Sequence, residues 1–235
     1  MHLITASVVF AGLWMSGPVA AEEEGVAVAI VYDTSGSMND PVNDAAGKAS
    51  PKYLIANRAL IAIANRLQNF ATNGPAGAPR KVQAGLFEFQ DGNPRVALPL
   101  APLNASALTQ WAKSFSAPDG GTPLGNTLEA ASRALMKSGL TRKHVLFITD
   151  GMNTVGPEPA AILARVQQTA IQQQTSVSVH FVAFDVDAKV FNGVKKLGAT
   201  VVAAANEDEL NHQLEFILEK KILLEDEEAP PAKKP

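Results

Sequence analysis

The chain has 235 residues, 46% hydrophobic and 18% charged, which fits one domain with tails and excludes disorder over most of its length. Its 20 Lys and Arg residues against 23 Asp and Glu residues give a net charge of −3. No basic surplus is therefore left to neutralise a phosphate backbone, which argues against nucleic-acid binding. The chain has no cysteine, which excludes disulfides, thiolate zinc sites and catalytic thiols.

The first 21 residues are typical of a secretory signal peptide. Residues 3–15 are almost wholly apolar, and the small residues Val19, Ala20 and Ala21 follow soon after, as at a cleavage site. This apolar stretch is shorter than the roughly 20 residues that cross a bilayer. Because Lys and Arg are missing before it, a buried N-terminal strand or helix is the alternative. We expect cleavage after Ala21 and a periplasmic or secreted domain over residues 22–224, without a membrane span.

Strands and helices alternate along the rest of the chain. In chain order, hydrophobic periodicity predicts a strand at 26–32, a helix at 53–70, strands at 82–89 and 95–98, helices at 105–115 and 124–137, a strand at 144–149, a helix at 158–173, a strand at 177–184, a short helix at 189–196, a strand at 200–203 and a helix at 207–224. Such alternation indicates a doubly wound α/β fold, with a parallel sheet and helices on both faces. Residues 225–235 are acidic, then rich in Pro and Lys, and we expect a disordered tail there.

Three polar segments stand where predicted elements end or begin. Asp33-Thr34-Ser35-Gly36-Ser37 follows the first strand, Thr149-Asp150-Gly151 ends the strand at 144–149, and Gly120-Gly121-Thr122-Pro123 opens a helix. In a parallel sheet, the loops after the strands gather at one edge, so we expect these segments to meet. Carboxylates and hydroxyls without imidazole or thiol suit a hard cation, which would be Mg²⁺, Mn²⁺ or Ca²⁺.

The same three segments, in this order, resemble the metal-ion-dependent adhesion site of von Willebrand factor type A domains of the bacterial exported type. The resemblance covers about residues 26–224 and implies a six-stranded, mostly parallel sheet with one short antiparallel edge strand at 95–98. It further implies that Ser35, Ser37 and Thr122 bind the metal directly. Asp33 and Asp150 would hold metal-bound waters, and Asp150 would become a direct ligand in an alternative state.

Each segment also has a purely structural interpretation. Ser35 and Ser37 are common helix caps, Thr122 before a proline is a common helix start, and Asp150 before a glycine is typical of a turn. Asp119 matches no position of the family motif, and we interpret it as a loop carboxylate.

One further polar residue stands at a predicted strand. His144 begins the strand at 144–149 and has no His, Glu or Asp at ligand spacing. We therefore interpret it as an ordinary strand-edge residue.

Catalytic interpretations have less support. Ser35 interrupts the D-[TS]-G motif of aspartic proteases and stands where phosphatases of the haloacid dehalogenase type carry a second Asp. The sequence contains no G-x-S-x-G, Walker A or G-x-G-x-x-G motif. We predict an exported, non-enzymatic module whose cation binds an Asp or Glu carboxylate of a partner protein. The alternatives are an accessory factor for assembly of, or cofactor delivery to, another exported protein, and a metal-dependent hydrolase.

Overall fold

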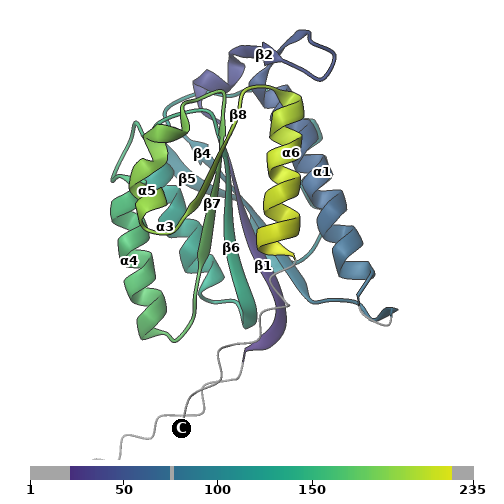
Figure 1. Ribbon diagram of the computed structural model, residues 1–235, viewed down its shortest axis with the longest axis vertical. Coiled ribbons are helices and arrows are strands. Elements are labelled where there is room, and N and C mark those ends of the chain that lie inside the picture. The colour runs from purple at the N-terminus through teal and green to yellow at the C-terminus, as the bar shows by residue number, and fades with distance from the viewer. Residues whose placement is uncertain (1–21, 75–76, 224–235) are drawn as a thin grey trace, which may run out of the picture.

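One six-stranded sheet with helices on both faces organises the computed structural model, which describes residues 22–74 and 77–223 (Figure 1). The strand order is β5-β4-β1-β6-β7-β8. Within these residues β5 runs antiparallel to β4, and the other neighbouring strands of this sheet are parallel. The predicted doubly wound α/β fold, with one antiparallel edge strand, is confirmed. The predicted signal peptide and tail lie outside the described residues.

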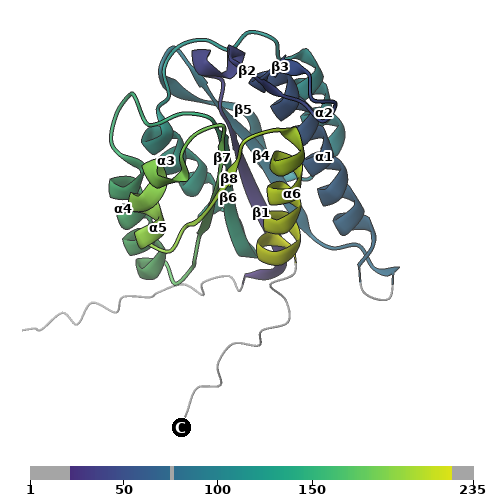
Figure 2. The same ribbon diagram turned by 45° about the horizontal axis from the view of Figure 1, so that its top comes forward.

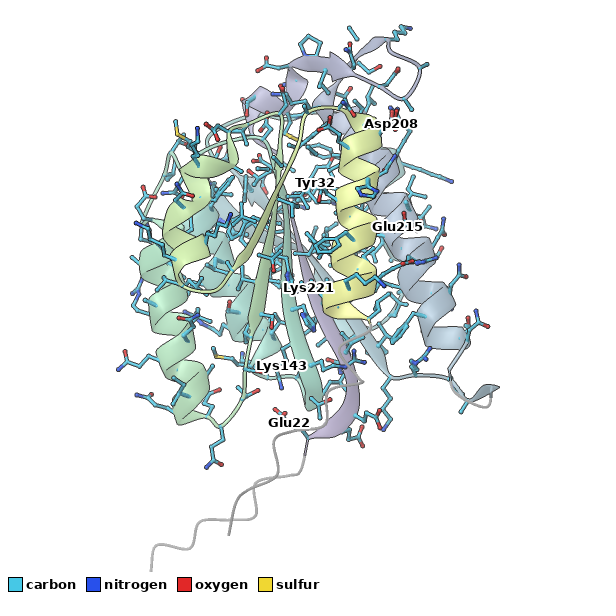
Figure 3. The ribbon with its side chains drawn as sticks, viewed as in Figure 1. Glu22, Tyr32, Lys143, Asp208, Glu215 and Lys221 are labelled. Atoms are coloured by element: carbon cyan, nitrogen blue, oxygen red, sulfur yellow. The ribbon has the colours of Figure 1, made fainter. Side chains whose placement is uncertain are left out.

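The strands match the predicted ones in position, and three of them are longer by three residues or more. They are β1 (Glu23–Tyr32), β4 (Val82–Gln90), β5 (Asn93–Pro102), β6 (Leu140–Thr149), β7 (Ser178–Phe184) and β8 (Thr200–Ala204). The edge strand β5 has 10 residues and not the four predicted, and it includes prolines, which an edge strand tolerates. β6 begins four residues before the predicted start, within a polar stretch. Lys143 lies there with its ammonium 2.5 Å from Glu22, at the lower end of the sheet (Figure 3).

The helices begin and end close to the predicted positions. They are α1 (Lys52–Thr72), α2 (Ala105–Ser114), α3 (Leu124–Leu135), α4 (Pro159–Gln172), α5 (Asn192–Lys196) and α6 (Glu207–Ile217). A 3₁₀ turn, η3 (Ala188–Phe191), precedes α5, and a π turn, η4 (Leu218–Ile222), follows α6. The sequence did not predict the 3₁₀ turn η1 (Gly36–Asn39) or the small hairpin of β2 (Pro41–Asn43) and β3 (Ala49–Pro51). That hairpin lies at the end of the molecule where β1 and β6 end (Figure 2).

The central strand β1 separates two cores. Its residues Val26 to Tyr32 are fully buried, as expected for a strand covered on both faces. Its even-numbered residues pack with α1, α2 and α6, and its odd-numbered residues pack with α3 and α4. Tyr32, the last residue of the strand, packs edge-on against Trp111 of α2, and its hydroxyl donates to Asn57 Oδ1 of α1 at 2.7 Å. This packing fixes where the strand ends and the polar segment begins.

A pair of buried histidines joins the neighbouring strands β6 and β7. His144 Nδ1 and His180 Nε2 are 3.1 Å apart, and the two rings stack. The interpretation of His144 as an ordinary strand-edge residue is therefore wrong, because His144 is buried within β6 and contacts a histidine 36 residues further along the chain. Burial, with His180 and Arg142 nearby, lowers the pKa of His144 to about 3. Burial, with Lys221 nearby, lowers the pKa of His180 to about 4.

The histidine pair predicts that stability falls in mild acid. Because both folded pKa values lie below the unfolded value of about 6.5, protons bind the unfolded chain first, and stability is lost as the pH falls below 6.5. Relative to a His144→Gln/His180→Gln variant, the wild type should lose about 2 kcal/mol of unfolding free energy per histidine between pH 7 and pH 5. Urea unfolding at both pH values measures this. Parallel pH dependence in the two proteins would contradict it.

Candidate metal site

The predicted polar segments meet at the carboxyl ends of β1 and β6. These strands are hydrogen-bonded neighbours, with Tyr32 opposite Ile148, and the Asp33 amide continues the pairing by donating to the Ile148 carbonyl at 3.0 Å. The first residues beyond the two strands are therefore held side by side. Thr149 Oγ1 donates to Asp33 Oδ2 at 2.5 Å.

Asp33 is a fully buried carboxylate. Its Oδ1 accepts from the Ser35 amide at 2.8 Å and from Ser35 Oγ at 2.5 Å. Burial, together with the charge of Asp150, raises the pKa of Asp33 to about 6, although the hydrogen bonds from Ser35 and Thr149 act to lower it. A cation placed nearby would favour the charged form of such a group.

The two serines link Asp33 to Asp150. Ser35 Oγ lies 3.2 Å from Ser37 Oγ, and Ser37 Oγ donates to Asp150 Oδ1 at 2.8 Å. Ser35 occupies the N-cap position of η1, but its side chain makes no capping hydrogen bond. Its hydroxyl is instead directed at Asp33. The result is one continuous row of side-chain oxygens from β1 to β6.

Thr122 approaches the same row from the loop before α3. It is buried, its amide donates to Thr154 Oγ1 at 2.7 Å, and its carbonyl accepts from the Thr154 amide at 3.0 Å. A Cβ placed on Gly151 would lie 3.5 Å from Thr122 Oγ1 and 3.8 Å from Ser37 Oγ. The two hydroxyls thus border the space in front of Gly151, which a larger residue would fill. All the residues predicted as metal ligands lie in this one place.

Hydrogen bonds of Thr34 connect the loop before α3 and the strand β4 to the end of β1. Its carbonyl accepts from the Asp119 amide at 2.8 Å, and its hydroxyl both donates to the Phe89 carbonyl at 2.9 Å and accepts from the Phe89 amide at 3.0 Å. Gly36 adds a contact by donating to the Gly120 carbonyl at 3.1 Å. Asp119 itself is exposed, in agreement with its interpretation as a loop carboxylate.

Two charged residues at the site were not predicted from the sequence. The Lys52 ammonium lies 3.0 Å from Asp150 Oδ2 and 3.0 Å from Asp185 Oδ2, and the Lys52 side chain is only 6% exposed. Burial acts to lower the pKa of Lys52, but the hydrogen bonds and charges of Asp150 and Asp185 outweigh it and raise that pKa above its usual value. In the sequence, Lys52 stands just before the helix predicted at 53–70, and Asp185 directly follows the strand predicted at 177–184; neither belongs to a motif.

The donor set is that of a hard cation. Across residues 22–74 and 77–223, no group of three or more His, Cys, Asp or Glu side chains has an arrangement that would hold a metal. Here the candidate donors are the carboxylates of Asp33 and Asp150 and three hydroxyls, so a bound cation would depend on hydroxyl and water oxygens. Mg²⁺ and Mn²⁺ accept such ligands, and Mg²⁺ commonly keeps several waters.

Residues 28–153 match the family model of the von Willebrand factor type A domain. The chain belongs to this family. The matched stretch of the VWA domain runs from β1 to the loop after β6 and includes every predicted ligand. A search of curated protein sequences gave no match.

Solved structures show the same fold at low sequence identity. A mutant of the PilB minor pilin from Streptococcus sanguinis superposes with a TM-score of 0.62 and 15% identity, over 87% of this chain and 62% of the pilin. Proximal thread matrix protein 1 from the mussel byssus, with a zinc-occupied MIDAS motif, gives a TM-score of 0.61 and 15% identity, over 85% of this chain and 48% of that protein. The vWF domain of the pili tip protein Mfa5 from Porphyromonas gingivalis gives a TM-score of 0.57 and 14% identity, over 82% of this chain and 93% of that domain. The chain therefore spans less than two thirds of the first two proteins.

No helix in the described part of the chain is long and apolar enough to cross a membrane. This finding covers α1, which has 21 residues but carries charged and polar side chains along its length.

The two hydrogen bonds of the Thr34 hydroxyl predict that replacing this residue by valine lowers the stability of the domain. Thr34→Val keeps the shape of the side chain but leaves the buried amide and carbonyl of Phe89 without their partner, so the unfolding free energy should fall by about 1–3 kcal/mol. Thr72→Val, at an exposed hydroxyl that bonds within α1, is the matched control and should cost less than about 0.5 kcal/mol. Urea unfolding compares the two, and equal losses would contradict this role of Thr34.

Proposed function

We propose that this VWA domain binds one divalent cation, with Mg²⁺ or Mn²⁺ preferred to Ca²⁺, and through it a protein partner. The observation that carries the proposal is the row of oxygens from Asp33 through Ser35 and Ser37 to Asp150, which runs between two adjacent strand ends. Structural hydroxyls would be expected to cap helices or bond to nearby backbone, whereas these bond to each other and to carboxylates. The zinc reported in the MIDAS motif of the byssus protein supports a divalent ion in this fold.

Ser35, Ser37 and Thr122 would hold the cation through their hydroxyl oxygens. Asp33 and Asp150 already accept hydrogen bonds from neighbouring side chains, which suits them to hold metal-bound waters rather than the metal itself. The bound cation would supply a positive centre that accepts a carboxylate from outside. The role of this chain is to position the oxygens and to keep part of the coordination sphere open.

The charge balance explains why the partner would supply an Asp or Glu. Hydroxyl oxygens are neutral, and the carboxylates of Asp33 and Asp150 act at a greater distance, so much of the double positive charge remains uncompensated. An incoming carboxylate is then preferred to another water. We infer an adhesion or interaction module rather than an enzyme. The pilin and the pili tip protein among the structural relatives support this inference and the placement of the domain outside the cytoplasm.

Cation binding is expected to depend on Asp33. Asp33→Asn keeps the side-chain shape and removes the charge, so the Mn²⁺ affinity should fall at least tenfold in isothermal titration, and the rise in melting temperature at a given Mn²⁺ concentration should be smaller than in the wild type. Asp119→Asn is the matched control, because Asp119 is an exposed carboxylate on the adjacent loop, and it should bind as the wild type does. Equal affinities for wild type and Asp33→Asn would contradict the site.

Partner capture is expected to need both the cation and Thr122. The immobilised domain should retain a protein from an exported fraction in Mg²⁺ and release it in EDTA. Thr122→Ala should weaken that capture while leaving measurable Mn²⁺ binding, since Ser35, Ser37 and Asp33 remain. Capture that persists in excess EDTA would show that the contact lies elsewhere on the surface.

A further inference from the structure

The buried ammonium group of Lys52 lies next to the proposed metal site, where it pairs with Asp150. Lys52 lies at the start of α1, directly after the β2–β3 hairpin, and its amide donates to the Asp40 carbonyl at 3.0 Å. Its ammonium reaches Asp150 at the end of β6 and Asp185 beyond the end of β7, both at 3.0 Å. Asp185 has a backbone φ of +54°, a conformation that is uncommon for residues other than glycine, and its amide is held by the Ala204 carbonyl at 2.7 Å. The lysine is therefore anchored from two strands.

The two oxygens of Asp150 have different partners. Oδ1 accepts from Ser37, which faces the proposed metal position, and Oδ2 accepts from Lys52 on the opposite side. Moving this carboxylate toward a cation would draw Oδ2 away from the Lys52 ammonium and weaken a buried ion pair. Breaking such a pair is costly, because it leaves a buried charge without compensation.

We propose that Lys52 is a positioning residue that holds Asp150 out of direct contact with the cation. This inference rests on the proposed function of the site. With Asp150 tied to Lys52, one coordination position stays with water and remains available to the carboxylate of a partner. Without Lys52, Asp150 becomes a direct ligand, neutralises much of the cation's charge and competes with the partner. Lys52 thus lowers the affinity for metal and favours the partner.

Loss of the Lys52 ammonium is expected to strengthen metal binding, whereas loss of a residue that only supports the structure would weaken it. Lys52→Met removes a positive charge close to the cation and frees a carboxylate for it, so Mn²⁺ should bind at least tenfold more tightly. Coulomb's law sets tenfold as a lower bound, because a unit charge within about 10 Å of a divalent ion exceeds it at an effective dielectric constant of about 20. Bound Mn²⁺ should also lose one exchangeable water.

The experiment uses Mn²⁺ as the probe, with isothermal titration for affinity and water-proton relaxation for the number of waters on the bound ion. Lys52→Gln is the second variant. It keeps a hydrogen-bond donor without the charge, and it should behave as Lys52→Met does. Lys52→Met/Asp150→Asn should regain the lost water, because the direct ligand is removed. Lys113→Met, at an exposed lysine on α2, is the control and should match the wild type.

The outcomes separate this inference from the function on which it rests. Tighter Mn²⁺ binding with one water fewer in both neutral variants supports the positioning role. Unchanged or weaker binding with an unchanged water count, in either variant that folds, overturns it and leaves the proposed function in place. A wild-type protein that binds no Mn²⁺ overturns both.

Discussion

The carboxylate of Asp33 is the constraint around which this end of the molecule is organised. The central strand β1 is buried on both faces, and the residue that follows it is a fully buried acid. Burying a charge is costly unless donors compensate it. Hydroxyls of Ser35 and Thr149 and the amide of Ser35 supply that compensation, which in turn fixes the path of the chain after β1 and its contact with β6. The conformation of the chain around Asp33 thus follows from the need to supply hydrogen-bond donors to its carboxylate.

Hydrogen bonds alone leave the site with two neighbouring acids, and the charge of Asp150 raises the pKa of Asp33 still further. Positive charge resolves this conflict. Lys52 supplies it on one side of Asp150, and the proposed divalent ion would supply it between the carboxylates and the hydroxyls. The Lys52 ammonium and the proposed divalent ion would thus share the negative charge of Asp33 and Asp150. How that charge is divided between them would determine how strongly the metal attracts a carboxylate from a partner.

The sequence predicts that these side chains meet, because they directly follow or precede the elements with the clearest hydrophobic patterns. Asp33, Ser35 and Ser37 directly follow an apolar run, Asp150 ends another, and Thr122 precedes a helix, so strand order alone brings them together. Lys52 and Asp185 carry no such signal, since their contact depends on how α1 packs across the ends of β6 and β7. The histidine pair likewise depends on the register between two strands. β5 is longer than predicted, and the prolines in it are compatible with an edge strand.

The most direct test of the central claim is a crystal structure of the domain soaked in Mn²⁺, with anomalous data collected at the manganese edge. The account predicts one strong peak in front of Gly151, at direct bonding distance from the hydroxyl oxygens of Ser35 and Ser37, with the Lys52 ammonium still paired to Asp150. A peak elsewhere, or an empty site at Mn²⁺ concentrations in the millimolar range, would contradict it.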